Sequence, residues 1–436
     1  MEKEMVVGLL GFGTVGSGVH QLIEAHQDEL VHKLGRGVKV KRVLVYDLQK
    51  AREVQVNPEL LTNDASEILN DPEIGIVIEV MGGIEQARNY ILRAFEKGKH
   101  VVTANKDLMA LHGPELQSAA LENGCDLYYE ASVAGGIPII RGIEDGLVPD
   151  RIESIMGIVN GTTNYILTKM DDEGVSYEAA LKEAQELGFA EADPAGDVGG
   201  MDAARKMAIM ARLAFSIPVD LADVEVQGIE QLALDDLQFG KQLGLTMKLI
   251  GRAHFQDNRV ELSVEPAFLP NTHPLAAVKN ENNAVYVYGK AMGETMFYGP
   301  GAGSLPTATA VLSDTVAVIR NMILGVNGKQ VIAPRFEKVL KEPEQRNGQY
   351  YFRLQVQDRS GTFTVIASLF NKLDISFERI LQNPVNESDN SGLAEIIVVT
   401  HQTTLDRIDA AREELEKTEV VTGVKSCFRI EGGLNS

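Results

Sequence analysis

The segment spanning residues 184–206 holds the strongest candidate for chemistry in this chain. It reads AQELGFAEADPAGDVGGMDAARK and gathers carboxylates and a lysine around glycines. Glycine and proline predict a loop up to residue 200, after which small and apolar residues predict a helix over 201–213. Asp202 and Lys206 lie four residues apart on one face of that helix. An isolated pair of this kind is usually an exposed ion pair, but the apolar neighbours predict a polar stripe that faces a cleft. The preceding loop adds Glu191, Asp193 and Asp197.

A second candidate site is the glycine-rich turn at residues 11–16. Residues 5–10 predict a short apolar strand, and the residues after the turn predict a helix to about residue 29. In this position the G-x-G-x-x-G pattern predicts a dinucleotide site, because a helix N-terminus favours the pyrophosphate. A glycine turn without a ligand is the alternative. The predicted cofactor-binding residues are Gly11, Phe12, Gly13, Thr14, Val15 and Gly16.

The first third of the chain alternates strands with helices. We predict further strands at residues 38–46, 76–80, 100–103 and 126–130, and helices at 85–97 and 113–123. This order predicts an α/β fold with a doubly wound parallel sheet, which binds ligands at the carboxyl ends of its strands.

Three of these strand ends carry candidate residues. Asp47 suits the 2'-hydroxyl of NAD, whereas Lys50 and Arg52 suit the 2'-phosphate of NADP, so the choice of cofactor stays open. Lys106 lies either beside the nicotinamide or in a solvated loop. The glycine turn over residues 130–138 either holds a cation or leads into the next domain.

The middle of the chain mixes helices and strands, which predicts an α+β substrate domain. We expect strands at residues 152–158, 248–254, 260–264 and 283–288, and a helix at 307–322. The strand at 283–288 belongs either to a dimer surface or to the core. His273 stands between two prolines in a loop, where a structural role is more common than catalysis.

The C-terminal part follows a linker rich in Lys, Glu and Pro. Its pattern is strand, helix, strand, strand, helix, strand, which is the βαββαβ plan of a ferredoxin-like unit. The loop at residues 358–362, DRSGT, lies between the first strand and helix. This loop either binds a ligand or has only a structural or dimerising role. A fold alone does not prove ligand binding. The six elements are expected at 351–356, 362–373, 376–382, 394–400, 405–418 and 424–430.

Composition limits the possible partners. The 436 residues suffice for two or three domains. With 62 acidic and 41 basic residues the net charge is -21, which argues against nucleic-acid and anionic-membrane partners. No apolar run approaches the ~18 residues of a membrane span, and no leader precedes the first strand, so we expect a cytoplasmic protein. The two cysteines, Cys125 and Cys427, fit a reducing compartment.

Taken together, these segments resemble the homoserine dehydrogenase family, bacterial type with a C-terminal ACT regulatory domain. The similarity runs from about residue 5 to the end, and the stretch ending at Lys206 resembles the family signature. The resemblance implies a Rossmann-type domain at 1–134 plus 304–330, a substrate-binding and dimerisation domain at 135–303, a linker at 331–349 and an ACT domain at 350–436. The matching pieces include GLLGFGTVGSGV, HVVTANKDLMA, EASVAGGIPII, GIVNGTTNYILTKM, LGFAEADPAGDVGGMDAARKMAI and YGPGAGSLPTATAV.

The resemblance also implies an activity and roles for residues. The family oxidises L-homoserine reversibly to L-aspartate 4-semialdehyde with NAD or NADP, on the route to threonine and methionine. Lys206 is then the acid/base residue, Asp202 supports it, and Lys106 lies at the nicotinamide and the substrate oxygen. Glu191 and Asp197 hold the substrate, and Gly303 approaches the cofactor. A monovalent cation, usually sodium, is expected at Glu130, Val133, Gly135 and Ile137.

A lysine suits this reaction. The cofactor supplies or takes the hydride, and the protein must move one proton at the substrate oxygen. A protonated lysine donates during aldehyde reduction, and a neutral lysine accepts during alcohol oxidation. The resemblance further implies a homodimer or homotetramer and feedback control by threonine at the ACT domain. Two alternatives stay open: another nicotinamide enzyme of amino-acid metabolism, and a non-catalytic sensor that binds a dinucleotide and an amino acid.

Overall fold

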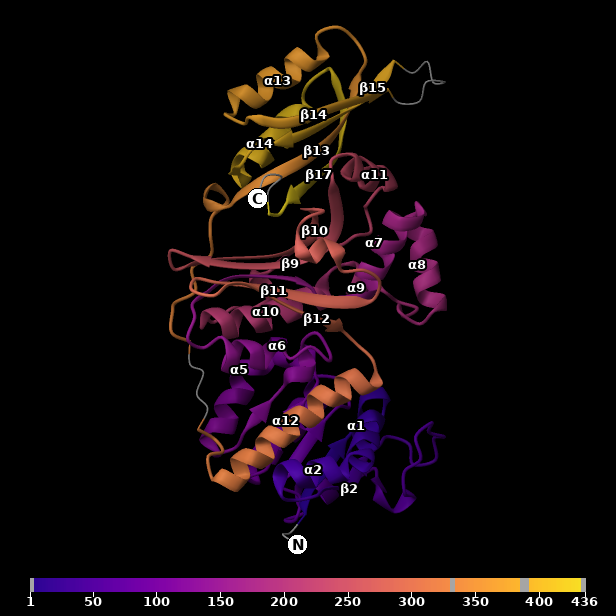
Figure 1. Cartoon of the computed structure of the whole chain (residues 1–436), viewed down its shortest axis with the longest axis vertical. Helices are drawn as coiled ribbons and strands as arrows, with labels where there is room; N and C mark the ends of the chain where they lie inside the picture. Colours follow the sequence, from indigo (N-terminus) through magenta and orange to yellow (C-terminus); the bar gives the residue numbers. More distant parts are fainter. Residues whose placement is uncertain (1–3, 330–333, 385–391, 433–436) are drawn as a thin grey trace.

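A six-stranded parallel sheet lies at the N-terminal end of the molecule (Figure 1). The computed structural model describes residues 4–329, 334–384 and 392–432. The strand order is β3-β2-β1-β4-β5-β6, with every neighbouring pair parallel. The predicted doubly wound sheet is therefore confirmed, and only the two-residue β3 escaped prediction. Its strands are β1 (Met5–Leu10), β2 (Val38–Leu44), β3 (Leu61–Thr62), β4 (Ile76–Glu79), β5 (His100–Thr103) and β6 (Leu127–Tyr128).

Two helices of this unit differ from their predicted bounds. The predicted helix to residue 29 is two helices that break at His26. The helix predicted from residue 113 begins at Lys106, because Asn105 caps it by accepting a hydrogen bond from the amide of Leu108. Lys106 is thus the first residue of a helix and not a loop lysine. The helices are α1 (Thr14–Ala25), α2 (Gln27–Leu34), α3 (Ser66–Leu69), α4 (Glu85–Glu96) and α5 (Lys106–Glu122).

Helix α12 (Ser304–Leu324) returns from the middle of the chain to pack on α1 (Figure 1). It is long and apolar enough to cross a membrane, unlike any other helix in the described residues. It contains no uninterrupted apolar run of that length, since Ser and Thr side chains, Asp314 and Arg320 interrupt it. Ala308, Val311 and Val318 are fully buried against Val19 and Ile23 of α1. We therefore assign α12 to the protein core.

The second sheet begins with the middle of the chain. The strands predicted at 152–158, 248–254, 260–264 and 283–288 are all present, and the central two extend to 12 residues each. Strands β8 and β12 were not predicted. The strands are β7 (Ile152–Ile158), β8 (Glu225–Val226), β9 (Leu245–Gln256), β10 (Arg259–Pro270), β11 (Asn282–Gly289) and β12 (Gly293–Pro300). The helices are α6 (Ile139–Arg141), α7 (Gly161–Glu173), α8 (Tyr177–Glu186), α9 (Ala195–Val198), α10 (Met201–Phe215) and α11 (Leu234–Gln242).

The C-terminal residues form the predicted βαββαβ unit. Residues 330–333, the last residue of the predicted cofactor domain and the first three of the predicted linker, lie outside the described part. The unit extends the second sheet, whose order is β12-β11-β7-β9-β10-β17-β13-β15-β14. The junction is a parallel pairing of β17 with β10, which places Arg429 opposite Ala267 and Ile430 opposite Phe268. The elements are β13 (Asn347–Gln357), α13 (Thr362–Lys372), β14 (Phe377–Pro384), β15 (Leu393–Thr400), β16 (Thr403–Thr404), α14 (Leu405–Glu416) and β17 (Val421–Ile430).

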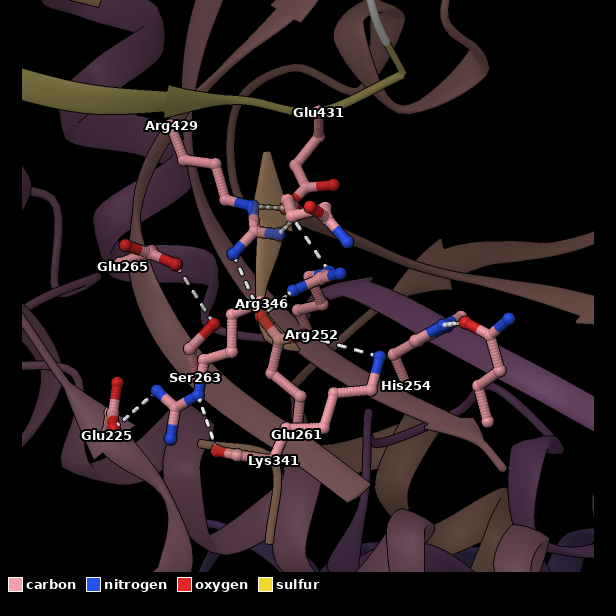
Figure 2. Close-up of polar contacts among 12 residues, drawn as sticks. Glu225, Arg252, His254, Glu261, Ser263, Glu265, Lys341, Arg346, Arg429 and Glu431 are labelled. Carbon is pink, nitrogen blue, oxygen red and sulfur yellow. Dashed lines mark hydrogen bonds and ion pairs between the residues drawn. The ribbon is translucent and has the colours of Figure 1, made fainter. Parts of the chain in front are cut away.

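Buried charges reinforce this junction. Glu261 of β10, 3% exposed, pairs with Arg252 of β9 and accepts a hydrogen bond of 2.8 Å from Arg429 of β17. Figure 2 shows Arg429 between Glu261 and Glu431, with 2.9 Å between Arg429 Nε and Glu431 Oε1. Loss of the arginine would leave Glu261 with one charged partner fewer in a buried place, which is costly. The C-terminal unit is therefore an integral part of the second sheet.

Candidate active site

The glycine turn has the shape that a dinucleotide needs. Gly11 adopts φ +107°, and a Cβ there would lie 2.7 Å from both the Cα of Met81 and the carbonyl oxygen of Val80. A Cβ on Gly16 would lie 2.3 Å from the Gly11 carbonyl oxygen. By contrast, a Cβ on Gly13 would meet no atom within 4 Å. No side chain caps the N-terminus of α1, so its first amides are open to an anion.

Gly303 lies next to this turn. It precedes α12 with φ +118°, and Ser304 Oγ donates a hydrogen bond of 2.7 Å to the Thr14 carbonyl oxygen. The start of α12 therefore meets the start of α1, and the structure brings Gly303 to the predicted cofactor residues although about 290 residues separate them in sequence.

A cavity of about 320 Å³ begins at Val15 in this turn and reaches both candidate lysines, Lys106 and Lys206. Gly135 and Thr307 line another part of its wall. Such a cavity can hold the reactive ends of a dinucleotide and a small substrate side by side, with the lysines at the reacting atoms.

Asp202 joins the two lysines. It is 4% exposed, and its Oδ2 accepts a hydrogen bond of 2.7 Å from Lys206 Nζ while its Oδ1 pairs with Lys106 Nζ. Burial opposes its ionisation, but the two ammonium groups outweigh burial and hold the pKa of Asp202 well below its usual range. Burial likewise lowers the pKa of Lys106, yet the charge of Asp202 prevails and raises that pKa above its usual value. Both groups are therefore charged at neutral pH.

Lys206 has two fixed acceptors. Its Nζ donates to the carbonyl oxygen of Val159 at 2.6 Å as well as to Asp202. An ammonium group has three donors, so one N–H is left for a group in the cavity. Met201–Phe215 forms α10 as predicted, and the Asp202–Lys206 spacing of four residues produces their contact.

Asn160 was missed by the sequence analysis. It precedes α7, and its Oδ1 accepts a hydrogen bond from the Thr163 amide at 2.9 Å. Its Nδ2 donates to Asp202 Oδ2 at 2.9 Å and to Asp197 Oδ1 at 2.8 Å, so one amide connects two predicted site residues. The signal was available, because Asn160 stands between a predicted strand that ends at residue 158 and a helical stretch, where asparagine is a common helix cap.

A second network of hydrogen bonds, also missed by the sequence analysis, supports the backbone at Lys106. Asn105 Nδ2 donates to the Gly83 carbonyl oxygen at 2.7 Å, and the Asn105 amide donates to Thr103 Oγ1 at 3.0 Å. Thr103 Oγ1 in turn donates to Glu79 Oε2 at 2.6 Å. Glu79 is fully buried, and burial raises its pKa. These contacts fix the N-terminus of α5 at the carboxyl ends of β4 and β5.

Glu191 is not brought into this cluster. It lies exposed on the loop before α9, where its carbonyl oxygen accepts a hydrogen bond from Gln185 Nε2 at 3.1 Å. Its carboxylate makes no hydrogen bond or ion pair within the described residues. His273 is also remote from the cluster: its Nδ1 accepts from the Leu275 amide at 3.2 Å, which is the structural role favoured by its sequence context.

The turn at residues 130–137 supplies carbonyl oxygens and no free carboxylate. Glu130 Oε1 and Oε2 accept hydrogen bonds from the amides of Ile140 and Arg141, at 2.8 and 2.9 Å. Ala134 and Gly135 are both left-handed, with φ of 53° and 55°. The described residues contain no cluster of three or more His, Cys, Asp or Glu side chains suited to a metal ion.

The end of β2 leaves the cofactor choice open. Arg52 donates hydrogen bonds to the carbonyl oxygens of Asp47, at 2.6 Å, and Lys50, at 2.8 Å. Asp47 Oδ1 accepts from the Gln49 amide at 2.8 Å. Either Asp47 or the basic side chains of Lys50 and Arg52 can therefore face the adenosine ribose. The choice between NAD and NADP stays open.

Two family profiles match the chain. The profile described as homoserine dehydrogenase, NAD binding domain, matches residues 11–130, and the profile described as homoserine dehydrogenase matches residues 138–316. Among curated relatives, homoserine dehydrogenase of Bacillus subtilis is 56% identical over 99% of both chains. That of Corynebacterium glutamicum is 42% identical over 98% of this chain and 95% of the relative.

Solved structures agree with these matches. A homoserine dehydrogenase from Thiobacillus denitrificans has a TM-score of 0.91 at 38% identity and covers 98% of both chains. A structure from S. aureus has a TM-score of 0.79 at 37% identity, covering 99% of this chain and all of the other. A hyperthermophilic archaeal homoserine dehydrogenase in complex with NADPH has a TM-score of 0.61 at 25% identity, over 73% of this chain and 98% of that one.

Proposed function

This chain belongs to the homoserine dehydrogenase family. We propose that Lys206 transfers the proton in the family's reaction, that Lys106 stabilises charge on the substrate oxygen, and that Asp202 holds both lysines. The enzyme interconverts L-homoserine and L-aspartate 4-semialdehyde with NAD or NADP as cofactor. We assign these roles because the buried carboxylate of Asp202 contacts both lysines at the wall of the cavity.

The bound nicotinamide supplies or accepts the hydride, and the chain's own residues handle the proton. Lys206 directs its remaining N–H to the substrate oxygen, donates that proton during aldehyde reduction and takes it back during oxidation. Lys106 stays an ammonium group because Asp202 raises its pKa, so it stabilises negative charge that develops on the oxygen. Asp202 and the Val159 carbonyl hold Lys206 in place. We expect homoserine oxidation to be faster at alkaline pH, since oxidation needs a neutral base.

For the substrate ammonium group we propose Asp197 and Glu191. Asp197 Oδ1 is held by Asn160, and Thr162 Oγ1 lies 3.4 Å from its Oδ2. Glu191 lies exposed on the adjoining loop, and its carboxylate, unbonded within the described residues, is available to an ammonium group. We predict that Glu191→Gln raises the KM for homoserine and leaves kcat nearly unchanged; an unchanged KM would remove Glu191 from the site.

The cofactor proposal rests on the space at Gly13. We predict that Gly13→Ala keeps the melting temperature, because the new Cβ contacts no protein atom within 4 Å, yet weakens NADPH binding about 10-fold or more by blocking the approach of the pyrophosphate. Fluorescence titration with NADPH measures this. Gly423→Ala is the matched control, as it also meets nothing within 4 Å and lies in the C-terminal unit. Equal affinity in the Gly13 variant would contradict the assignment of residues 11–16.

We also propose a sodium site at the carbonyl oxygens of Glu130, Val133, Gly135 and Ile137. The consecutive left-handed residues curl this turn, and the Glu130 carboxylate is committed to two amides. Carbonyl oxygens alone suit a singly charged hard cation better than a divalent one. Replacing sodium chloride by choline chloride at equal ionic strength should lower the melting temperature, and equal melting temperatures would count against the site.

Regulation by threonine at the C-terminal unit is a further proposal. Gly361, with φ +92°, opens α13 after the exposed residues Asp358, Arg359 and Ser360. We predict that threonine inhibits homoserine oxidation and that Arg359→Ala weakens this inhibition while kcat stays the same. Arg412→Ala, another exposed arginine of the same unit, is the control. Absence of inhibition in the native chain would exclude threonine, and unchanged inhibition in Arg359→Ala would exclude the loop.

Finally, we propose a cytoplasmic homo-oligomer. Edge strand β12 exposes Met296 and Tyr298, and the neighbouring β11 exposes Tyr288. A second copy of the chain can cover this apolar edge. Light scattering on the eluting protein should give at least twice the mass of one chain, and Tyr298→Lys should lower it; a monomeric native protein would exclude this interface.

A further inference from the structure

Pro114 leaves an unsatisfied carbonyl inside α5. The helix runs from Lys106 to Glu122 with this proline in its interior. Proline has no N–H, so the carbonyl oxygen of Ala110, four residues earlier, has no donor within the helix. The neighbouring element must supply one.

Arg212 of α10 supplies this donor. Its Nη2 donates to the Ala110 carbonyl oxygen, and its Nη1 donates to the Met109 carbonyl oxygen at 2.9 Å. Its Nε donates to the Val219 carbonyl oxygen at 2.7 Å, which orients the guanidinium. Gly113 leaves room for it, since a Cβ there would lie 3.1 Å from Arg212 Nη1. Within the described residues no carboxylate forms an ion pair with Arg212, so three carbonyl oxygens bind its charge.

Side-chain packing between the two helices is incomplete beside Arg212. A cavity of about 290 Å³ lies beside the guanidinium, lined by Met109, Pro114, Ile209 and Leu213 among others. Buried apolar residues of both helices share one core cluster, and polar contacts join α5 to α10 in addition: Lys106 with Asp202, Asp107 with Arg205 at 2.8 Å, and the Arg212 hydrogen bonds. Arg212 lies six residues beyond Lys206, which is about 1.7 turns and about 9 Å along α10.

We infer that Arg212 is a positioning residue for the reaction, which it serves by fixing α5 against α10 and thus Lys106 against Asp202. The inference rests on the proposed role of Lys106. Helix α5, which begins at Lys106, packs on the cofactor sheet, whereas α10, which carries Asp202 and Lys206, packs on the second sheet. Figure 1 shows the two helices between the sheets. Arg212 therefore sets the alignment of two parts of the site that come from different sheets.

The test separates positioning from simple helix support. Arg212→Met should lower the rate of hydride transfer in a single turnover about 10-fold or more, since small displacements of catalytic groups are costly, with NADPH affinity within twofold of native. It should also lower the melting temperature. Pro114→Ala alone should keep the native rate. Pro114→Ala/Arg212→Met restores a donor to the Ala110 carbonyl, so its melting temperature should recover while its rate stays low.

Two results would overturn the inference. One is a native rate in folded Arg212→Met, and the other is recovery of the rate together with the melting temperature in the double variant. If Arg212→Met does not fold, the double variant carries the test. Lys106→Met is measured alongside: if it loses activity while Arg212→Met does not, the role of Lys106 stands and the positioning role fails. A native rate in Lys106→Met would overturn both.

Discussion

Lys206→Ala is expected to lower kcat for NADPH-dependent reduction of aspartate semialdehyde by about 100-fold or more, the size of a lost general acid. Lys206 has one N–H free for the substrate after Val159 and Asp202 take the other two. Alanine removes the proton donor and leaves water to replace it. NADPH affinity should stay near native, because the glycine turn is untouched. Absorbance at the nicotinamide band measures both the turnover and, with NADH, the cofactor preference.

The control for this variant is Lys182→Ala, since Lys182 is largely exposed and, among the described residues, pairs with Glu186 one turn later. It should retain native turnover. If Lys206→Ala stays active, the proton passes through Lys106 or water, and the assignment is wrong. If the native protein binds NADPH without turning over aspartate semialdehyde, the sensor alternative gains support.

Asp202→Asn is expected to lower kcat by about 100-fold and to destabilise the fold by about 3–5 kcal/mol, because it leaves two buried or half-buried ammonium groups without their shared counter-charge. The amide can still occupy the same space, so packing is kept. Removal of the charge should also lower the pKa of Lys106, which Asp202 raises in the native protein. Turnover and urea unfolding of the variant measure the two effects separately.

The pH dependence of this stabilisation has a definite sign. The pKa of Asp202 is depressed on folding, so its contribution is present above the unfolded pKa near ~3.9 and is lost as pH falls toward the folded value. The pKa of Lys106 is raised, so its contribution is present below ~10.4 and is lost as pH rises through the folded value. The stability difference between native protein and Asp202→Asn should therefore be roughly constant from pH 5 to 9 and shrink at both extremes.

Asp172→Asn is the matched control, since Asp172 forms a half-exposed pair with Lys279. Its effect on stability should stay within about 1 kcal/mol, as for surface ion pairs generally. Native turnover in Asp202→Asn would show that the shared carboxylate is dispensable for proton transfer. An equal loss of stability in both variants would show that the coupling of the two lysines is no stronger than a surface pair.

The sequence by itself determined the features that depend on near neighbours. Strand and helix periodicity predicted the parallel sheet and the βαββαβ unit, because alternating and helical patterns report which side of an element is buried. The G-x-G-x-x-G turn was recognisable because it directly follows a predicted strand and precedes a predicted helix, which are both local features. The Asp202–Lys206 contact followed from a spacing of four residues on one helix.

Only the tertiary structure decided the contacts between distant segments. Lys106 reaches Asp202 across 96 residues, and Asn160 links Asp197 to Asp202 between three separate elements. The start of α5 was misplaced because Gly113 and Pro114 favour a helix boundary locally, whereas Arg212, about 100 residues away, satisfies the carbonyl that Pro114 leaves unpaired. The pairing of β17 with β10 was equally invisible, since an edge strand shows no preference for its neighbour until both edges are present. Local pattern fixes which side chains are buried, but a buried polar group takes its partner from whichever segment the fold brings to it.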